Sequence, residues 1–228
     1  MAPSAFFRAL RAKEILIRSE EIEKAPILKE EGGKKKQTGT KYFLPLLLYK
    51  DARADQNLLD RTCGPLGWKR EHKVEGGKTF CRVSLKDPAT GEWIAKEDVG
   101  SAGGFERDKS LASDSFKRAC SCWGIGRELY TVPSSFGIAF EEKEGEDPPF
   151  RIERDEEGRL FCPDRFFVKE VAFNSLKELI RIVFRNADTG GEFERDFPHR
   201  DQTPWSDTQV KNPWTEKKNE ELNKEEEL

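Results

Sequence analysis

The segment from Lys109 to Tyr130 constrains the fold more than any other part of this 228-residue chain. Its apolar residues recur every three or four positions, which places them on one face of a helix: Ala112, Phe116, Ala119 and Trp123. Gly124 and Gly126 follow, and glycine commonly ends helices. The sequence therefore predicts one amphipathic helix that packs this apolar face on the rest of a domain and is closed by these glycines.

The opposite face of the predicted helix carries Asp114, Ser121 and the adjacent cations Lys117 and Arg118. A Lys-Arg pair on a helix is more often a solvated surface than a binding site. The pair alone therefore favours the solvated surface, and the rest of the chain has to decide whether an anion binds there.

Charge is distributed unevenly along the chain. Residues 1–134 carry a net charge of +6, whereas residues 135–228 carry −9. A polyanion-binding body with an acidic tail has this pattern, and so does a domain with a merely solubilising tail.

The apolar run at residues 43–49 is too short to span a membrane, and the acids near the N-terminus do not suit a signal peptide. We expect a cytoplasmic protein with no membrane partner.

The cysteines favour reduced thiols rather than disulfides or a metal centre. Their number is odd, and they fall on apolar or helical positions: Cys63, Cys81, Cys120, Cys122 and Cys162. A Cys-x-Cys pair on a helix points its side chains roughly 200° apart, and no nearby histidine or cysteine completes a ligand set. We expect neither a metal nor a cofactor.

A helix, three strands and the long helix follow one another in the middle of the chain. Residues 51–62 read as a helix, and three short runs separated by turn signals read as an antiparallel meander: residues 68–74, 78–87 and 92–99. Alternation in the middle strand puts Cys81, Val83 and Leu85 on the core face, and Phe80, Arg82, Ser84 and Lys86 on the other. This order predicts an α+β unit.

The glycine-rich link at residues 100–104 precedes the long helix and invites comparison with a phosphate-binding loop. It lacks the Walker pattern, because Lys109-Ser110 lies too far along the chain. We therefore interpret it as a flexible connection.

Further strands are expected at residues 165–173, 176–184 and 192–197.

Four segments in order carry a resemblance to a known family: YKDARADQNLLDRTCGPLGW (residues 49–68), RVSLKD (82–87), EDVG (97–100) and SDSFKRACSCWGIGRELY (113–130). The chain resembles the Rad-fifty-two superfamily of single-strand annealing proteins, and most of all the versions carried by bacteriophages and prophages. The resemblance covers residues 49–133. It moves the interpretation of the Lys-Arg pair from a solvated surface to a DNA site.

The resemblance implies a β-β-β-α core, with an antiparallel sheet packed on a long helix, in protomers that form a ring of roughly eleven. Single-stranded DNA would lie in a basic groove, its phosphates contacted by Lys117, Arg118 and Arg53. Lys86 matches a family lysine of a second, outer DNA site, and Arg82 shares its strand face. Ser121 stands where eukaryotic members have a further arginine, for which Arg127 is a candidate substitute.

The expected domain organisation follows from the resemblance and from the flanking sequence. Helical periodicity over residues 4–24 predicts an arm, and the charged, glycine-containing residues 30–41 predict a flexible joint. Pro204 begins a charged, proline-containing tail with the bias of disorder. The predicted division is an arm and joint (1–40), an annealing domain (41–200, with its core at 49–133 and a strand-rich extension at 148–198) and an acidic tail (201–228).

The expected function is ATP-independent binding and annealing of single-stranded DNA in homologous recombination and repair, without enzymatic activity. The expected partners are single-stranded DNA, further copies of the chain, and a phage exonuclease or a single-strand-binding protein. One alternative is a protein that binds and protects DNA ends without annealing. Another is a nuclease built on Asp87, Glu97 and Asp98, which is disfavoured because adjacent strand residues face opposite ways.

Overall fold

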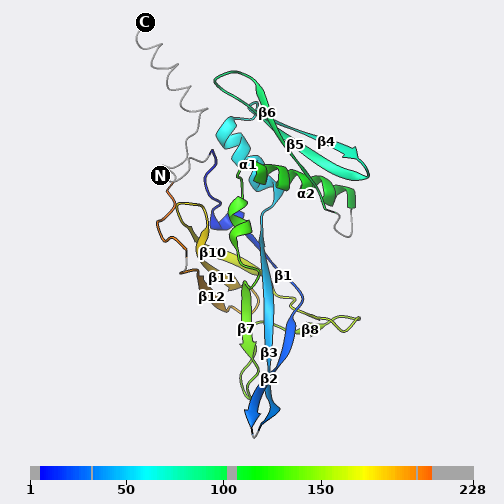
Figure 1. Cartoon of the computed structure of the whole chain (residues 1–228), viewed down its shortest axis with the longest axis vertical. Helices are drawn as coiled ribbons and strands as arrows, with labels where there is room; N and C mark the ends of the chain where they lie inside the picture. Colours follow the sequence, from blue (N-terminus) through cyan, green and yellow to red (C-terminus); the bar gives the residue numbers. More distant parts are fainter. Residues whose placement is uncertain (1–5, 32, 102–106, 199, 207–228) are drawn as a thin grey trace.

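The computed structural model describes residues 6–31, 33–101, 107–198 and 200–206. The fold is α+β, with antiparallel sheets and two α-helices. Figure 1 shows a three-stranded sheet with both helices at one end of the molecule, and a long hairpin at the other. Residues 102–104 of the glycine-rich link, residues 105 and 106, and the tail beyond residue 206 lie outside the described residues.

Helix α1 (Ala52–Cys63) confirms the helix predicted for residues 51–62. It begins where the side chain of Asp51 accepts a hydrogen bond from the backbone N–H of Arg53 at 2.7 Å, which is the usual role of an N-cap aspartate. Its apolar face buries Leu58 and Leu59 completely or nearly so. Gly64 ends the helix with a φ of 75°, a conformation that glycine adopts without strain.

The meander is also present, as strands β4 (Trp68–Glu75), β5 (Lys78–Lys86) and β6 (Trp93–Val99) in the order β4-β5-β6. Cys81, Val83 and Leu85 of the middle strand are buried, as the alternation predicts. On the other face Arg82 and Lys86 are exposed, but Ser84 is buried, so that face is not uniformly solvated.

Helix α2 (Arg107–Cys122) packs across this sheet. Phe116 and Ala119 are fully buried, and the indole N–H of Trp123 donates to the carbonyl of Val83 at 3.0 Å. The helix ends at Cys122, directly before Trp123 and the two glycines, so the predicted glycine stop is confirmed. Gly124 and Gly126 take positive φ values of 93° and 69°, which break the helical hydrogen bonding, and a separate 3-10 turn, η2 (Arg127–Thr131), follows.

The helix predicted for residues 4–24 and the joint predicted for residues 30–41 are both wrong. The chain instead forms a 3-10 turn and three strands: η1 (Ala12–Glu14), β1 (Leu16–Ser19), β2 (Glu23–Glu31) and β3 (Lys34–Tyr49). Isoleucine favours strands when a pairing partner exists, and β1 pairs with the end of β3. Gly33, with a φ of 75°, belongs to the turn of the β2–β3 hairpin.

The larger sheet has seven strands in the order β12-β11-β10-β1-β3-β2, with β7 (Gly137–Glu141) paired to β3. The three late strands expected from the sequence are present as β10 (Phe166–Phe173), β11 (Leu179–Asn186) and β12 (Glu192–Asp196). Phe184 lies at the centre of the core of this sheet, with the rings of Phe136, Phe166 and Phe193 centred 5.2–6.4 Å away.

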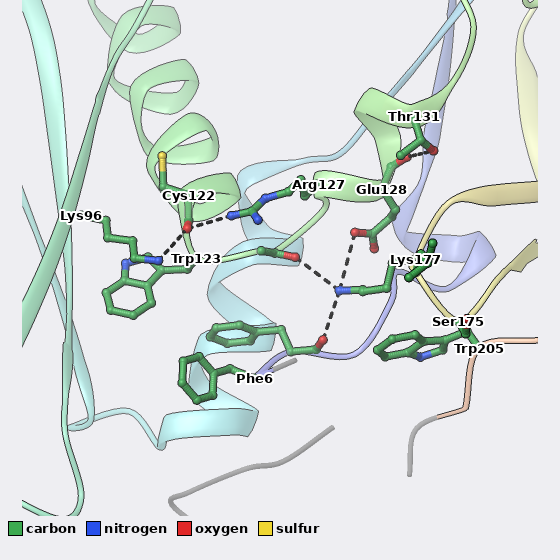
Figure 2. Close-up of a pocket in the computed structure, with 13 residues that line it drawn as sticks. Phe6, Lys96, Cys122, Trp123, Arg127, Glu128, Thr131, Ser175, Lys177 and Trp205 are labelled. Carbon is green, nitrogen blue, oxygen red and sulfur yellow. Dashed lines mark hydrogen bonds and ion pairs between the residues drawn. The ribbon is translucent and has the colours of Figure 1, made fainter. Parts of the chain in front are cut away.

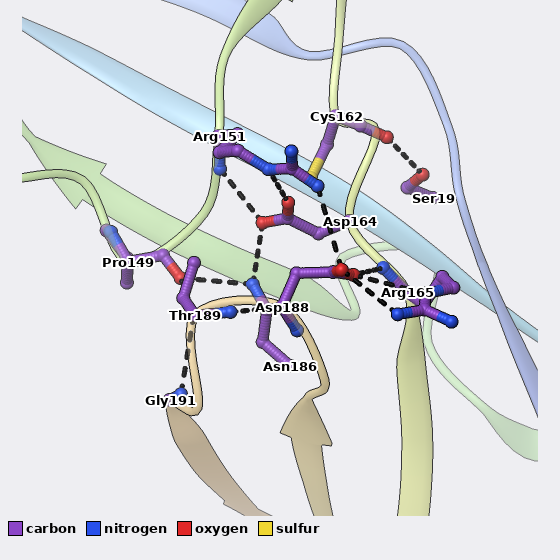
Figure 3. Close-up of polar contacts among 10 residues, drawn as sticks. All are labelled: Ser19, Pro149, Arg151, Cys162, Asp164, Arg165, Asn186, Asp188, Thr189 and Gly191. Carbon is purple, nitrogen blue, oxygen red and sulfur yellow. Dashed lines mark hydrogen bonds and ion pairs between the residues drawn. The ribbon is translucent and has the colours of Figure 1, made fainter.

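A small ribbon, β8 (Glu153–Arg154) and β9 (Leu160–Phe161), is held to this sheet by polar contacts (Figure 3). The buried carboxylate of Asp164 accepts hydrogen bonds from the backbone N–H of Arg151 at 2.9 Å and from the side-chain amide of Asn186 at 2.7 Å. Asp188 pairs with Arg165 at 3.1 Å. These contacts fix the loop before β8 against the β11–β12 turn.

Strand β3 connects the two ends of the molecule (Figure 1). Its first part pairs with β2, its middle with β7, and its last four residues with β1. Lys50 and the N-cap Asp51 follow it directly, so the large sheet leads into α1. Within the described residues, no helix is long and apolar enough to cross a membrane.

Candidate nucleic-acid interface

A groove of about 470 Å³ lies where the end of β3, the middle of α2 and the turn η2 meet. Among the described residues, four cationic residues line it: Arg18 of β1, the buried Lys50 just before α1, and the consecutive Lys117 and Arg118 of α2. Two tyrosines, Tyr49 and Tyr130, line it as well. The groove therefore combines cations with aromatic rings, the two kinds of side chain that hold single-stranded nucleic acid.

The two α2 cations remain available to a ligand. The side chain of Lys117 makes no hydrogen bond or ion pair with a described residue. Arg118 forms a long ion pair with Asp98, with 3.5 Å between Nε and Oδ1, but 40% of its side chain is exposed and Nε makes no hydrogen bond with a described residue. Among the described lining residues the one acid is Asp114, whose carboxylate accepts hydrogen bonds from the backbone N–H and hydroxyl of Ser101.

A buried ion pair lies beneath these cations. The ammonium of Lys50 contacts the carboxylate of Asp55 and donates to the backbone carbonyl of Lys117 at 3.3 Å. Burial raises the pKa of Asp55 to about 6, although the charge of Lys50 acts in the opposite direction. Because Lys50 joins the start of α1 to the backbone of α2, it fixes the position from which Lys117 projects.

Gly126 is required next to this pair. A Cβ at this position would lie 2.4 Å from Cε of Lys50, and the residue has a φ of 69°. A larger residue would therefore displace the buried lysine as well as strain the backbone.

Arg127 has a different position from the other predicted site residues (Figure 2). Its guanidinium donates to the carbonyls of Ser121 at 2.9 and 3.0 Å and of Cys122 at 2.9 Å. These are carbonyls of the last turn of α2, where a cation also interacts favourably with the helix dipole. Arg127 lines a second pocket rather than the groove.

This second pocket, of about 320 Å³, contains a partly buried lysine and a buried glutamate (Figure 2). The ammonium of Lys177 donates to the carbonyls of Phe7, Arg8 and Gly124 at 3.1–3.3 Å and lies 3.7 Å from Glu128. Burial lowers the pKa of Lys177. Glu128 also accepts from the backbone N–H of Leu10 at 2.7 Å. The pair ties the N-terminal segment and the β10–β11 turn to the end of α2.

The remaining predicted site residues lie away from the groove lining. Arg53 is exposed on the first turn of α1 and forms no ion pair with a described residue. Arg82 and Lys86 lie on the face of β5 that points away from the buried Cys81, Val83 and Leu85. There Arg82 pairs with Glu97 at 3.1 Å. The structure therefore brings Lys117 and Arg118 together and leaves Arg53, Arg82, Lys86 and Arg127 in other places.

The acids considered for a nuclease do not converge. Glu97 pairs with Arg82 and Lys73 on one face of β6, whereas Asp98 lies near Arg118 on the other. Asp87 accepts from the backbone N–H of Ala89 within its own turn. The described part of the chain holds no group of three or more His, Cys, Asp or Glu residues suited to a metal ion.

Two curated proteins align with this chain. The single-stranded DNA-binding protein DdrA of Deinococcus radiodurans is 38% identical over 93 residues, which are 40% of this chain and 43% of that protein. DdrA of Deinococcus deserti is 36% identical over 93 residues, 40% of this chain and 45% of that protein. The chain thus spans less than half of the length of these relatives. No family model and no solved structure matches it.

Sequence reasoning missed several groove residues. Tyr49 and Lys50 directly precede a helix that the sequence predicts, so their position at its start was a usable signal. Arg18 was missed because residues 4–24 were predicted to be a helix, whereas Arg18 lies on strand β1. Tyr130 lies in η2, beyond the glycine stop of α2, where the sequence analysis predicts no element.

Proposed function

We propose that this protein binds single-stranded DNA in the groove between β3, α2 and η2 and anneals complementary strands without ATP. The observation that carries the proposal is the pair of consecutive, partly exposed cations, Lys117 and Arg118, that lines one groove with Arg18. The similarity to two proteins named as single-stranded DNA-binding supports the nucleic-acid part. The resemblance of residues 49–133 to the annealing superfamily supports the annealing part.

Phosphate contacts suit this function. They are independent of sequence and sensitive to salt, and they leave the edges of the bases free to find a complementary strand. Annealing then requires only that two strands are positioned and that their repulsion is screened. No bond is broken, so no catalytic residue is needed.

An oligomer would strengthen such contacts. A few cations per protomer bind weakly, but a closed ring of roughly eleven protomers would hold a long strand by avidity. Arg53 would extend the inner path, and Lys86 with Arg82 would contribute to a second site on the exposed face of β5.

The proposal includes a role in homologous recombination and repair of the phage or prophage kind, in the cytoplasm of a bacterial host. The core would be residues 49–133 of an annealing domain at 41–200. The acidic residues 201–228 would engage a phage exonuclease or a single-strand-binding protein, whose basic surfaces they would complement.

The test is annealing of two complementary fluorescent oligonucleotides without ATP. The wild type is compared with a Lys117→Ala/Arg118→Ala double variant and with a control that removes two adjacent lysines at the hairpin tip, Lys35→Ala/Lys36→Ala. We expect annealing by the wild type and the control and its loss in the groove variant. Equal annealing by all three folded proteins would remove the groove from the proposal.

The second candidate function is binding and protection of DNA ends without annealing. It is favoured by the names of the two relatives, which state binding and not annealing. Tight binding of single-stranded DNA by the wild type without any acceleration of annealing would select this function.

A further inference from the structure

We infer that Tyr49 and Tyr130 form a stacking surface for the bases of the bound strand, in the same groove as the phosphate-binding cations. This inference rests on the proposed function and adds a second class of contact to it. The phosphates would be held by Lys117, Arg118 and Arg18, and the base faces by the tyrosine rings.

The two rings are exposed to an extent that the fold does not require. Tyr49 is 37% exposed and Tyr130 is 68% exposed. Neither side chain forms a hydrogen bond or a ring contact with a described residue. The third tyrosine behaves differently, because Tyr42 stacks on Phe140 with ring centroids 6.5 Å apart. The groove therefore holds two aromatic rings without an internal partner among the described residues.

Their surroundings extend this surface across the sheet. Tyr49 pairs with Leu16 of β1, and Leu16 pairs with Phe167 of β10, so the three side chains share one face. Leu47, two residues before Tyr49, is on the same face and also lines the groove. All of these side chains are exposed. An exposed apolar strip of this kind marks a binding surface.

The charge around the strip indicates which ligand covers it. The described lining has three cations that reach solvent, Arg18, Lys117 and Arg118, and one acid, Asp114, which already accepts two hydrogen bonds. A ligand that presents anionic groups beside flat apolar rings matches both features, and single-stranded DNA has this chemistry. Stacking uses the faces of the bases rather than their pairing edges. Bases held in this way would stay competent to pair.

The experiment measures binding of two oligonucleotides with the same backbone charge, each of roughly 20 nucleotides. One carries thymine at every position and the other is abasic. The variants are Tyr49→Ala/Tyr130→Ala, the ring-preserving control Tyr49→Phe/Tyr130→Phe, and Lys117→Ala/Arg118→Ala. Sedimentation velocity of every variant reports its oligomeric state.

We expect the wild type and the phenylalanine control to bind the thymine strand more tightly than the abasic strand, by roughly fivefold to 100-fold. The alanine variant of the tyrosines should lose this difference while its abasic affinity stays unchanged. The Lys117/Arg118 variant should lose affinity for both strands.

The other outcomes separate failure of this inference from failure of the proposed function. Equal affinity of the wild type for the two strands, or a tyrosine variant with unchanged preference, would overturn base stacking while leaving DNA binding intact. A change in the sedimentation of the tyrosine variant would assign the strip to contacts between copies and also overturn it. No binding of either strand by the wild type would overturn the proposed function itself.

Discussion

The ammonium of Lys50 contacts the carboxylate of Asp55, and both side chains are buried beneath the backbone of Lys117. The candidate DNA site therefore rests on a buried ion pair, and Lys50 of this pair is itself part of the lining of the groove. The pair belongs to the junction of β3 and α1, and its contact with α2 makes the position of Lys117 depend on a titratable group.

The stability of this junction should depend on the protonation of Asp55. Burial raises the pKa of Asp55 to about 6 from its ordinary value of 3.8. The folded protein thus binds this proton more tightly than the unfolded chain, so the contribution of Asp55 to stability is greatest below about pH 4 and is lost as the pH rises through about 6. Between these limits the wild type should lose up to roughly 3 kcal/mol of unfolding free energy relative to Asp55→Asn.

Denaturant unfolding of both proteins at about pH 4 and about pH 7 measures this difference. Parallel pH profiles of the two proteins would mean that Asp55 titrates in the native state as it does in the unfolded chain.

Asp164 should show the opposite dependence. Its burial opposes ionisation, but hydrogen bonds from Arg151 and Asn186 hold the pKa of the carboxyl below its ordinary range. Its stabilising contribution is therefore present above about pH 4 and is lost as the pH falls further. At about pH 7, Asp164→Asn should lower the unfolding free energy by roughly 1–3 kcal/mol, because an amide cannot accept all three hydrogen bonds.

The deficit of the Asp164→Asn variant should shrink when unfolding is repeated at about pH 3. A deficit of the same size at both pH values would show that packing, and not the charge of Asp164, stabilises the loop.

Replacing Arg127, just after α2, and replacing Arg53, on α1, should have different effects on stability and on DNA binding. Arg127→Ala removes three hydrogen bonds to carbonyls at the end of α2, so it should lower the unfolding free energy by roughly 1–2 kcal/mol. The Arg127→Ala variant should bind DNA with the same salt dependence as the wild type. Arg53→Ala should leave stability unchanged and reduce the slope of affinity against salt by about 1, since it would remove one phosphate contact.

Thermal unfolding and binding titrations at several salt concentrations make this comparison. The assignment of the two arginines would be reversed if Arg127→Ala changed the salt slope and Arg53→Ala changed the stability.

The cysteines should react in two classes. Cys63, Cys81, Cys120 and Cys162 are buried, and burial raises their pKa values, to about 12 for Cys63 and about 11 for Cys81 and Cys162. A raised pKa suppresses the reactive thiolate. Cys122 is only partly buried. A thiol-reactive dye should therefore label Cys122 rapidly in the native protein and all five cysteines after denaturation, and the Cys122→Ser variant should show no rapid phase.

Local signals made the middle of the fold predictable. Asp51 and Gly64 mark the two ends of α1, turn sequences separate β4, β5 and β6, and the spacing around Phe116 defines the buried face of α2. Each of these features depends on residues close together in the sequence.

The N-terminal region was not predictable in this way. Ile15, Ile17 and Ile22 fit a helical spacing, but β1 and β2 form because β3 supplies a distant pairing partner. The groove has a similar origin, since Arg18 and Tyr49 meet through the pairing of β1 with β3, and Tyr130 reaches them from η2. The sequence therefore identified the cations of α2 and not the surface that faces them.

The 16 residues of β3 form one strand that runs from the hairpin turn to Tyr49 at the groove. At a rise of about 3.3 Å per residue, the strand spans roughly 50 Å. Residues added or removed in pairs at the hairpin turn would lengthen or shorten both strands together without moving Tyr49, whose register is set by β1. The reach of the hairpin and the chemistry of the groove can therefore diverge independently in evolution, although a single strand carries both.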